Sequence, residues 1–210
     1  LKAMFEQKGA SPDEAEMMTY EAIKVGYRHI DTAEVYKNEK GVAGGIKKAI
    51  SDNIVKRSDL FITTKVFPGN ERWGQKQKTY EDVLEALNKS LDRLELSYVD
   101  LYLIHSAHAD QTRLDQWKAL IDLKQQEYIK FAGVANWNIN HLEEVKQNGL
   151  LLPDTNQIEL HPWAQQPELV SYLRENSVHI IAYSSLVPLS TWRTKEGENS
   201  LKTSEMDAEG

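Results

Sequence analysis

Residues 98–105, YVDLYLIH, form a mostly apolar run that ends in a histidine. A strand that is apolar along its whole length is typical of a parallel sheet covered by helices on both faces. The preceding residues, 79–94, place Val83 and four leucines at a helical period, and Thr79 is placed to cap that helix. A periodic helix followed by a mostly apolar strand predicts an α/β fold with a parallel sheet.

The same alternation extends over most of the chain. Expected strands cover 27–30, 60–64, 98–104, 129–135, 155–160 and 179–184. Expected helices cover 11–25, 41–50, 79–94, 114–126, 140–149 and 168–175. Two architectures accommodate this order, a (β/α) barrel and an open doubly wound sheet. A doubly wound dinucleotide fold carries a G-x-G-x-x-G turn after an early strand, and this sequence has none, which favours the barrel.

Three charged or titratable residues follow expected strands, each at the C-terminal end. Asp31, Lys65 and His105 stand at these positions, and Tyr36 lies on the loop just after the first of them. The C-terminal ends of barrel strands converge on one mouth, where barrel enzymes carry out their chemistry. We therefore expect these four side chains to lie together.

The four residue types have a common chemical logic. A phenol has an ordinary pKa near 10 and is a poor proton donor at neutral pH. A neighbouring ammonium stabilises the phenolate and lowers that pKa, while a carboxylate keeps the ammonium charged and in place. A histidine beside the phenol can orient a substrate oxygen. Together they predict an acid that protonates a carbonyl oxygen as hydride arrives from a cofactor.

Six segments in one order resemble the motifs of the aldo-keto reductases. They are GYRHIDTAEVYKNE (26–39), ITTKV (62–66), VDLYLIH (99–105), GVANWN (133–138), NQIELHP (156–162) and AYSSL (182–186). The resemblance implies a (β/α)8 TIM-type barrel and NADPH-dependent reduction of aldehydes or ketones to alcohols, with NADH left open as cofactor. It also implies a small-molecule carbonyl substrate and, for a full-length chain, a monomer.

The resemblance assigns a role to individual residues. Tyr36 would be the general acid, Lys65 and Asp31 the pair that tunes its pKa, and His105 the residue that orients the carbonyl. The cofactor residues would be Asn136 and Gln157 on the nicotinamide amide, Tyr183 stacked on its ring, and Ser184 and Leu186 at the pyrophosphate.

The sequence departs from the family pattern at several positions. Ala135 stands where a serine is usual, which removes one hydroxyl contact to the carboxamide, worth about 0.5–1.5 kcal/mol. Residues 106–108, Ser-Ala-His, replace the usual Trp-Pro after the histidine. Glu127 stands where a glycine is common and is expected to adopt a strained left-handed backbone. The lysine-and-arginine segment that binds the adenosine 2′-phosphate is not found.

The barrel is expected to be incomplete. Its first strand is expected before Leu1 and its eighth after residue 210, since a barrel of this type needs about 250 residues. The barrel domain is expected over 1–189, and the polar residues 190–210 are expected to form a surface loop or disordered tail. An alternative function therefore stays open: a truncated, non-catalytic fragment or scaffold that binds a nucleotide or a protein.

Composition narrows the remaining function classes. A net charge of −7 argues against nucleic-acid binding, and no apolar stretch of 18 residues predicts a membrane span. The sequence has no cysteine, and its first residues lack the pattern of a signal peptide, so we expect a cytoplasmic protein. His105, His108 and Asp110 raise the possibility of a metal site, but residues three apart on an extended segment face opposite ways, so no metal is expected.

Overall fold

In the part of the chain that the structure describes, a parallel sheet of seven strands forms the centre, with the strands in sequence order from β1 to β7. The computed structural model describes residues 4–6 and 9–185. The strands are β1 (Met4–Glu6), β2 (His29–Asp31), β3 (Phe61–Val66), β4 (Val99–Ile104), β5 (Ile129–Ala135), β6 (Thr155–Glu159) and β7 (His179–Tyr183). Every neighbouring pair is parallel, as the alternation of mostly apolar strands with amphipathic helices predicted.

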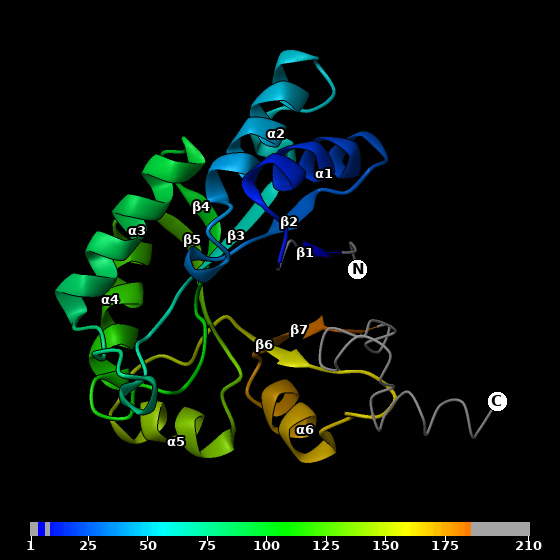
Figure 1. Cartoon of the computed structure of the whole chain (residues 1–210). Helices are drawn as coiled ribbons and strands as arrows, with labels where there is room; N and C mark the ends of the chain where they lie inside the picture. The colour runs from blue at the N-terminus through cyan, green and yellow to red at the C-terminus, as the bar shows by residue number, and fades with distance from the viewer. Residues whose placement is uncertain (1–3, 7–8, 186–210) are drawn as a thin grey trace.

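Helices connect successive strands and lie on the outer side of the sheet (Figure 1). They are α1 (Pro12–Lys24), α2 (Glu39–Ser51), α3 (Tyr80–Leu94), α4 (Arg113–Gln125), α5 (Ile139–Gln147) and α6 (Pro167–Glu175), with short 3-10 turns η1 (Glu34–Tyr36), η2 (Arg57–Asp59) and η3 (Glu71–Trp73). The expected boundaries hold within a few residues. One cap differs, because Asn138 and not Asn140 begins α5: its side chain accepts from the His141 amide. None of the described helices has both the length and the hydrophobicity to cross a lipid bilayer.

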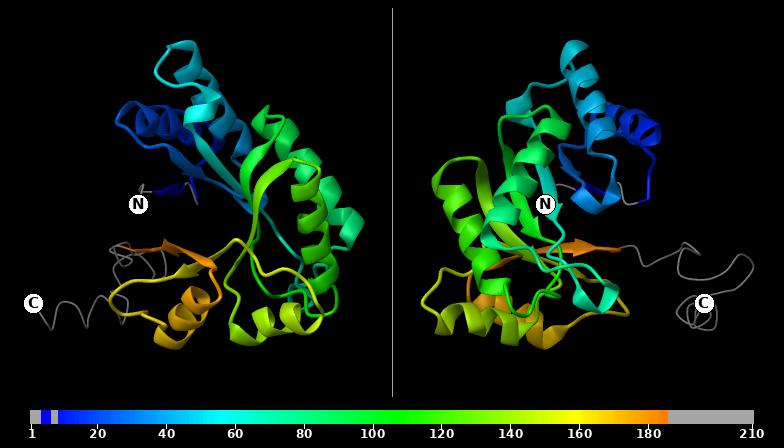
Figure 2. Two further views of the ribbon diagram at one scale, coloured as in Figure 1. Left: turned by 180° about the vertical axis from the view of Figure 1, so that it is seen from behind. Right: turned by 60° about the vertical axis from the view of Figure 1, so that its left-hand side comes forward.

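The sheet is strongly curled, as two contacts of one side chain prove. Gln157 on β6 donates from Nε2 to Asp31 Oδ2 on β2, at 3.0 Å, and approaches Met4 Sδ on β1 at 3.4 Å. In a flat sheet, strands four places apart would be separated by about 19 Å. Contacts across the inside of the sheet therefore require the curvature of a (β/α) barrel, which the two views of Figure 2 show.

The N-terminal strand corrects one expectation. We expected the first barrel strand before Leu1, and this was wrong, because Met4–Glu6 pairs with β2 in parallel. A three-residue strand is too short to show a periodic pattern in the sequence. β1 and β7 are the two edge strands of the described sheet. The expected eighth strand and the predicted tail over 190–210 lie outside the described residues.

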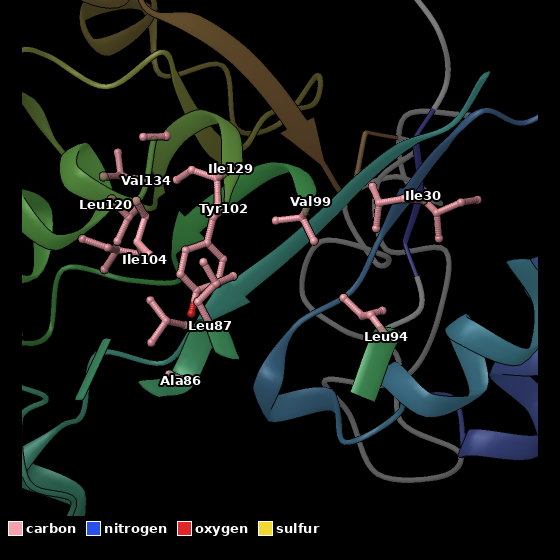
Figure 3. Packing of buried hydrophobic residues seen from close by; sticks show 14 of the residues in the cluster. Ile30, Ala86, Leu87, Leu94, Val99, Tyr102, Ile104, Leu120, Ile129 and Val134 are labelled. Carbon is pink, nitrogen blue, oxygen red and sulfur yellow. The ribbon is translucent and has the colours of Figure 1, made fainter. Parts of the chain in front are cut away.

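The main hydrophobic core lies between the outer face of the sheet and the helices. Tyr102 and Ile104 of β4 point into it and meet Leu87 of α3 (Figure 3). Alternate residues on a strand face opposite sides, so Leu101 and Leu103 are buried on the inner face. The strand that was expected to be mostly apolar is thus buried on both faces, and it supports the residue that follows it, His105.

Candidate active site

Three neighbouring strands bring charged or titratable residues to one end of the sheet. Asp31 is the last residue of β2, Lys65 lies next to the end of β3, and His105 follows β4 directly. The amide of His105 donates to the carbonyl of Val66 at 2.9 Å, which extends the pairing of β3 and β4 by one residue. The structure places these residues together at the C-terminal ends of the strands, as the sequence predicts.

Lys65 and Asp31 form an ion pair that is completely buried on the inner face of the sheet. Both side chains have an exposed fraction of 0%, and Lys65 Nζ contacts Asp31 Oδ1. Nζ also donates to the carbonyl of Thr32 at 3.0 Å. Removing charges from water is costly unless they are paired and hydrogen-bonded, and this pair meets both conditions. The ammonium is therefore fixed in position.

Tyr36 lies against this ion pair and against His105. It ends the short turn η1, and Lys65 Nζ is 5.1 Å from the centre of its ring. The rings of Tyr36 and His105 meet edge to face, with centroids 5.6 Å apart at 78°. Both residues are only partly buried. The arrangement places a reachable phenol between a buried ammonium and an imidazole.

The residues expected to contact a nicotinamide lie on the next strands, at the same end of the sheet. We call this end, with the residues that it carries, the rim. Asn136 follows β5 in a left-handed backbone conformation, φ 60°, and its Nδ2 donates to the carbonyl of His105 at 3.2 Å. The Tyr183 hydroxyl at the end of β7 donates to Asn136 Oδ1 at 2.8 Å. Gln157 bridges to Asp31 as described above. Ser184 follows β7 with φ 52°, and Leu186 lies outside the described residues.

Two of the departures from the family pattern have clear structural positions. Ala135 ends β5, is 1% exposed and is paired in register with Gln157. Glu127 has φ 63°, the left-handed conformation that was expected for it. A β-carbon in this region costs steric energy that a glycine avoids.

Two polar side chains follow His105, and one of them contacts the aromatic ring of Trp73. The Ser106 hydroxyl is 2.6 Å from Nδ1 of His108. The ring of His108 is 5.2 Å from that of Trp73, which in turn stacks on Phe67 at 6.3 Å. Trp73 is 64% exposed. It is carried by the loop of residues 69–78, which we call the flap.

The hypothetical metal ligands have other contacts. His108 is bonded to Ser106, and Asp110 accepts from Gln77 Nε2 at 2.7 Å. Within residues 4–6 and 9–185, no group of three His, Asp or Glu side chains is arranged to hold a metal ion.

His29 lies on the inner face of the sheet, and its pKa shows how strongly this face is shielded from water. Burial lowers the pKa of His29 to about 4, and the positive charge of Lys65 acts in the same direction. Its Nε2 is 2.8 Å from the hydroxyl of Thr63. No motif in the sequence singles out His29, because a histidine within a short strand carries no distinguishing pattern.

A cavity of about 500 Å3 lies elsewhere, on the outer side of the sheet. It is bounded by α4 and by the residues that precede β6, including Trp117, Leu151 and Asp154. None of the rim residues described above lines it. Titratable groups in mutual contact, rather than cavity size, are what identify the rim as the candidate active site.

Comparison with known proteins gives the family. A profile of the aldo/keto reductase family matches residues 2–209. The chain is 44% identical over 166 residues to glyoxal reductase of Bacillus subtilis, covering 79% of this chain and 56% of that protein. It is 42% identical over 182 residues to methylglyoxal reductase DkgA of Yersinia pestis, covering 86% and 60%. The chain thus spans less than two thirds of the length of these curated relatives.

Solved structures agree with this result. An aldo/keto reductase from Brucella melitensis superimposes with a TM-score of 0.77 at 39% identity, over 87% of this chain and 68% of that one. A Bombyx mori aldo-keto reductase in complex with NADP gives a TM-score of 0.78 at 31% identity, over 94% and 66%. The family profile, the sequence identities and the superposed structures all point to the same family. The chain belongs to the aldo/keto reductase family.

Proposed function

We propose that the protein reduces aldehydes or ketones to alcohols with NADPH, with Tyr36 as the proton donor. One observation carries the proposal: the partly exposed ring of Tyr36 has its centre 5.1 Å from the buried, paired ammonium of Lys65 and meets the ring of His105 edge to face. This environment favours the ionised form of a phenol and so makes it a better acid at neutral pH. The Bombyx mori relative that was solved with NADP supports the choice of cofactor.

In the proposed reaction, the substrate's carbonyl oxygen accepts hydrogen bonds from Tyr36 and His105. NADPH, when bound, supplies the hydride that the carbonyl carbon receives. The phenol of Tyr36 gives its proton to the carbonyl oxygen, so the products are an alcohol and NADP+, and a proton from water restores the phenol. Lys65 stabilises the transient phenolate, and Asp31 holds Lys65 in place.

Asn136 after β5, Gln157 within β6 and Tyr183 at the end of β7 fit a nicotinamide. Asn136 and Gln157 offer amide groups, and Tyr183 offers a ring beside them. Asn136 is already held by the His105 carbonyl, which sets its distance from the acid. We propose that these three residues bind the nicotinamide and that Ser184 and Leu186 contact the pyrophosphate. NADH remains an alternative cofactor.

The substrate class follows from the relatives together with the mouth of the site. Two relatives are named for glyoxal and methylglyoxal, which are small aldehydes with a second carbonyl oxygen. The Ser106–His108 pair next to His105 supplies polar groups that suit such an oxygen. We propose small α-oxoaldehydes as substrates, and we expect a monomer in the cytoplasm.

Replacement of Tyr36 by phenylalanine tests the proposal in the full natural chain. We expect kcat to fall by on the order of 10²–10⁴, with the affinity for NADPH unchanged in a calorimetric titration. Tyr20→Phe is the matched control, because it removes a hydroxyl that bonds Asp52 on the helix layer. More than about a tenth of wild-type kcat in Tyr36→Phe would exclude Tyr36 as the acid.

A second candidate function rests on length alone. The chain spans 56–60% of two curated relatives, so a non-catalytic fragment that binds a nucleotide or a protein is the alternative. Binding of NADPH without any turnover of methylglyoxal by the full natural chain would favour it.

A further inference from the structure

Tyr36 lies on a short turn rather than on a regular element, so other contacts must fix its position. η1 has only three residues, and Lys37 after it is in the left-handed region, φ 56°. Glu34, two residues before Tyr36, anchors the turn through its carboxylate. Oε1 pairs with Lys78 Nζ at 2.9 Å, and Oε2 accepts from the Phe67 amide at 3.2 Å.

Lys78 is the centre of this anchor. Besides Glu34, its Nζ donates to the Phe67 carbonyl at 2.9 Å. Its own backbone is fixed on both sides: the amide donates to the Pro68 carbonyl at 2.9 Å, and the carbonyl accepts from Gln116 Nε2 at 2.8 Å. Gln116 belongs to α4 and is 0% exposed. The Tyr36 turn is thereby attached to the rigid helix layer.

The preceding residue, Gln77, holds the loop that follows His105. Its side chain is 5% exposed. Oε1 accepts from the amides of Gln111 and Thr112 at 3.1 and 3.2 Å. Nε2 donates to Asp110 at 2.7 Å. Two consecutive residues at the base of the flap therefore hold the two loops that carry the facing rings of Tyr36 and His105.

We propose that Gln77 and Lys78 are positioning residues that keep Tyr36 and His105 in register for proton transfer. The inference rests on the proposed function of Tyr36. Lys78, through Glu34, sets the position of the phenol, and Gln77 sets that of the loop after the imidazole. The flap bears Trp73 against His108, so a substrate that contacts the flap acts on the same two anchors.

Lys78→Met and Glu34→Gln in the full natural chain test the first anchor. A misplacement of about 1 Å can cost on the order of 10²-fold in rate, so we expect kcat to fall about 10- to 100-fold for Lys78→Met. The affinity for NADPH should change less than about twofold, and Lys78→Arg should recover at least about a third of kcat. Lys89→Met is the control: Lys89 borders, with Glu34 and Lys78, a cavity of about 330 Å3 beside α3, but it pairs with Glu85 on the exposed face of that helix.

Amide hydrogen exchange tests both anchors without relying on activity. Lys78→Met should accelerate exchange in the peptide that contains Phe67, and Gln77→Leu in the peptide that contains Gln111 and Thr112. Gln75→Leu, an exposed residue of the flap, is the control and should change neither.

The outcomes separate the two proposals. Unchanged kcat in folded Lys78→Met, or unchanged exchange in both peptides, overturns the positioning role. A lowered melting temperature with kcat intact shows a merely structural role and also overturns it. If Tyr36→Phe retains activity, the proposed function fails instead, and exchange alone then decides whether Gln77 and Lys78 hold the two loops.

Discussion

Two consecutive residues of β3 contact buried carboxylates on opposite faces of the sheet, and the two sites differ in what lies beside them. Lys65 points inward and pairs with Asp31. Thr64 points outward, and its hydroxyl donates to Glu39 Oε1 at 2.6 Å. Arg93 Nε donates to the other oxygen of Glu39, also at 2.6 Å, and Glu39 is 1% exposed.

The outer cluster of Thr64, Glu39 and Arg93 stabilises the packing of the helices against the sheet. It connects α2, β3 and α3, and both oxygens of the carboxylate are bonded. The inner pair instead lies next to a partly exposed phenol. Burial of a charge therefore does not by itself identify a site. A buried charge indicates chemistry when a reachable group that can exchange a proton stands against it.

The sharpest test of this contrast separates activity from stability on the inner face. Lys65→Met alone leaves the Asp31 carboxylate buried and unpaired, which should cost about 3–5 kcal/mol. Adding Asp31→Asn removes both charges together, so the free energy of unfolding should return to within about 2 kcal/mol of wild type. Turnover should stay on the order of 10²–10⁴ below wild type. Urea unfolding and steady-state kinetics measure the two quantities, and a double variant with restored turnover would contradict the tuning role.

On the outer face, the expected result is the reverse. Glu39→Gln should lower the free energy of unfolding by about 2–4 kcal/mol, less than for a fully buried pair because Arg93 is 32% exposed. The kcat of the folded protein should stay within about twofold. Denaturant titration, with kinetics at a temperature well below the transition, checks both values. A large loss of kcat without a loss of stability would place this cluster in the catalytic machinery.

His29 makes the desolvation of the inner face measurable through pH. Folded His29 has a pKa of about 4, below its unfolded value near 6.5. The unfolded chain therefore binds the proton first, and the contribution of His29 to stability is complete above pH 6.5 and is lost as the pH falls towards 4. We expect a loss of roughly 2–3 kcal/mol. His29→Gln should flatten the pH dependence of unfolding in this window, and an unchanged slope would mean that His29 is well solvated.

Ala135→Ser has the smallest expected effect. The residue lies beside Gln157 at the end of β5, and a hydroxyl there would add one hydrogen bond to a nicotinamide amide. Binding of NADPH should tighten about two- to tenfold. Equal or weaker affinity by calorimetry would show that position 135 does not face the cofactor.

The sequence alone determined the parallel α/β order and the candidate residues. Apolar strands such as 98–104 and periodic helices such as 79–94 are local patterns, and each records its own burial. The motifs alone indicate Asp31, Tyr36, Lys65 and His105 as candidate residues. They did not reveal β1, because three residues are too few for a period.

Tertiary structure alone decided which residues meet across the sheet and around the mouth. The Gln157–Asp31 bond joins positions 126 residues apart, and the Lys78–Glu34 pair joins positions 44 apart. Neither partner has a local pattern that names the other. Such contacts depend on the curvature of the sheet and on the paths of loops, which are set by the packing of all elements together rather than by any one segment.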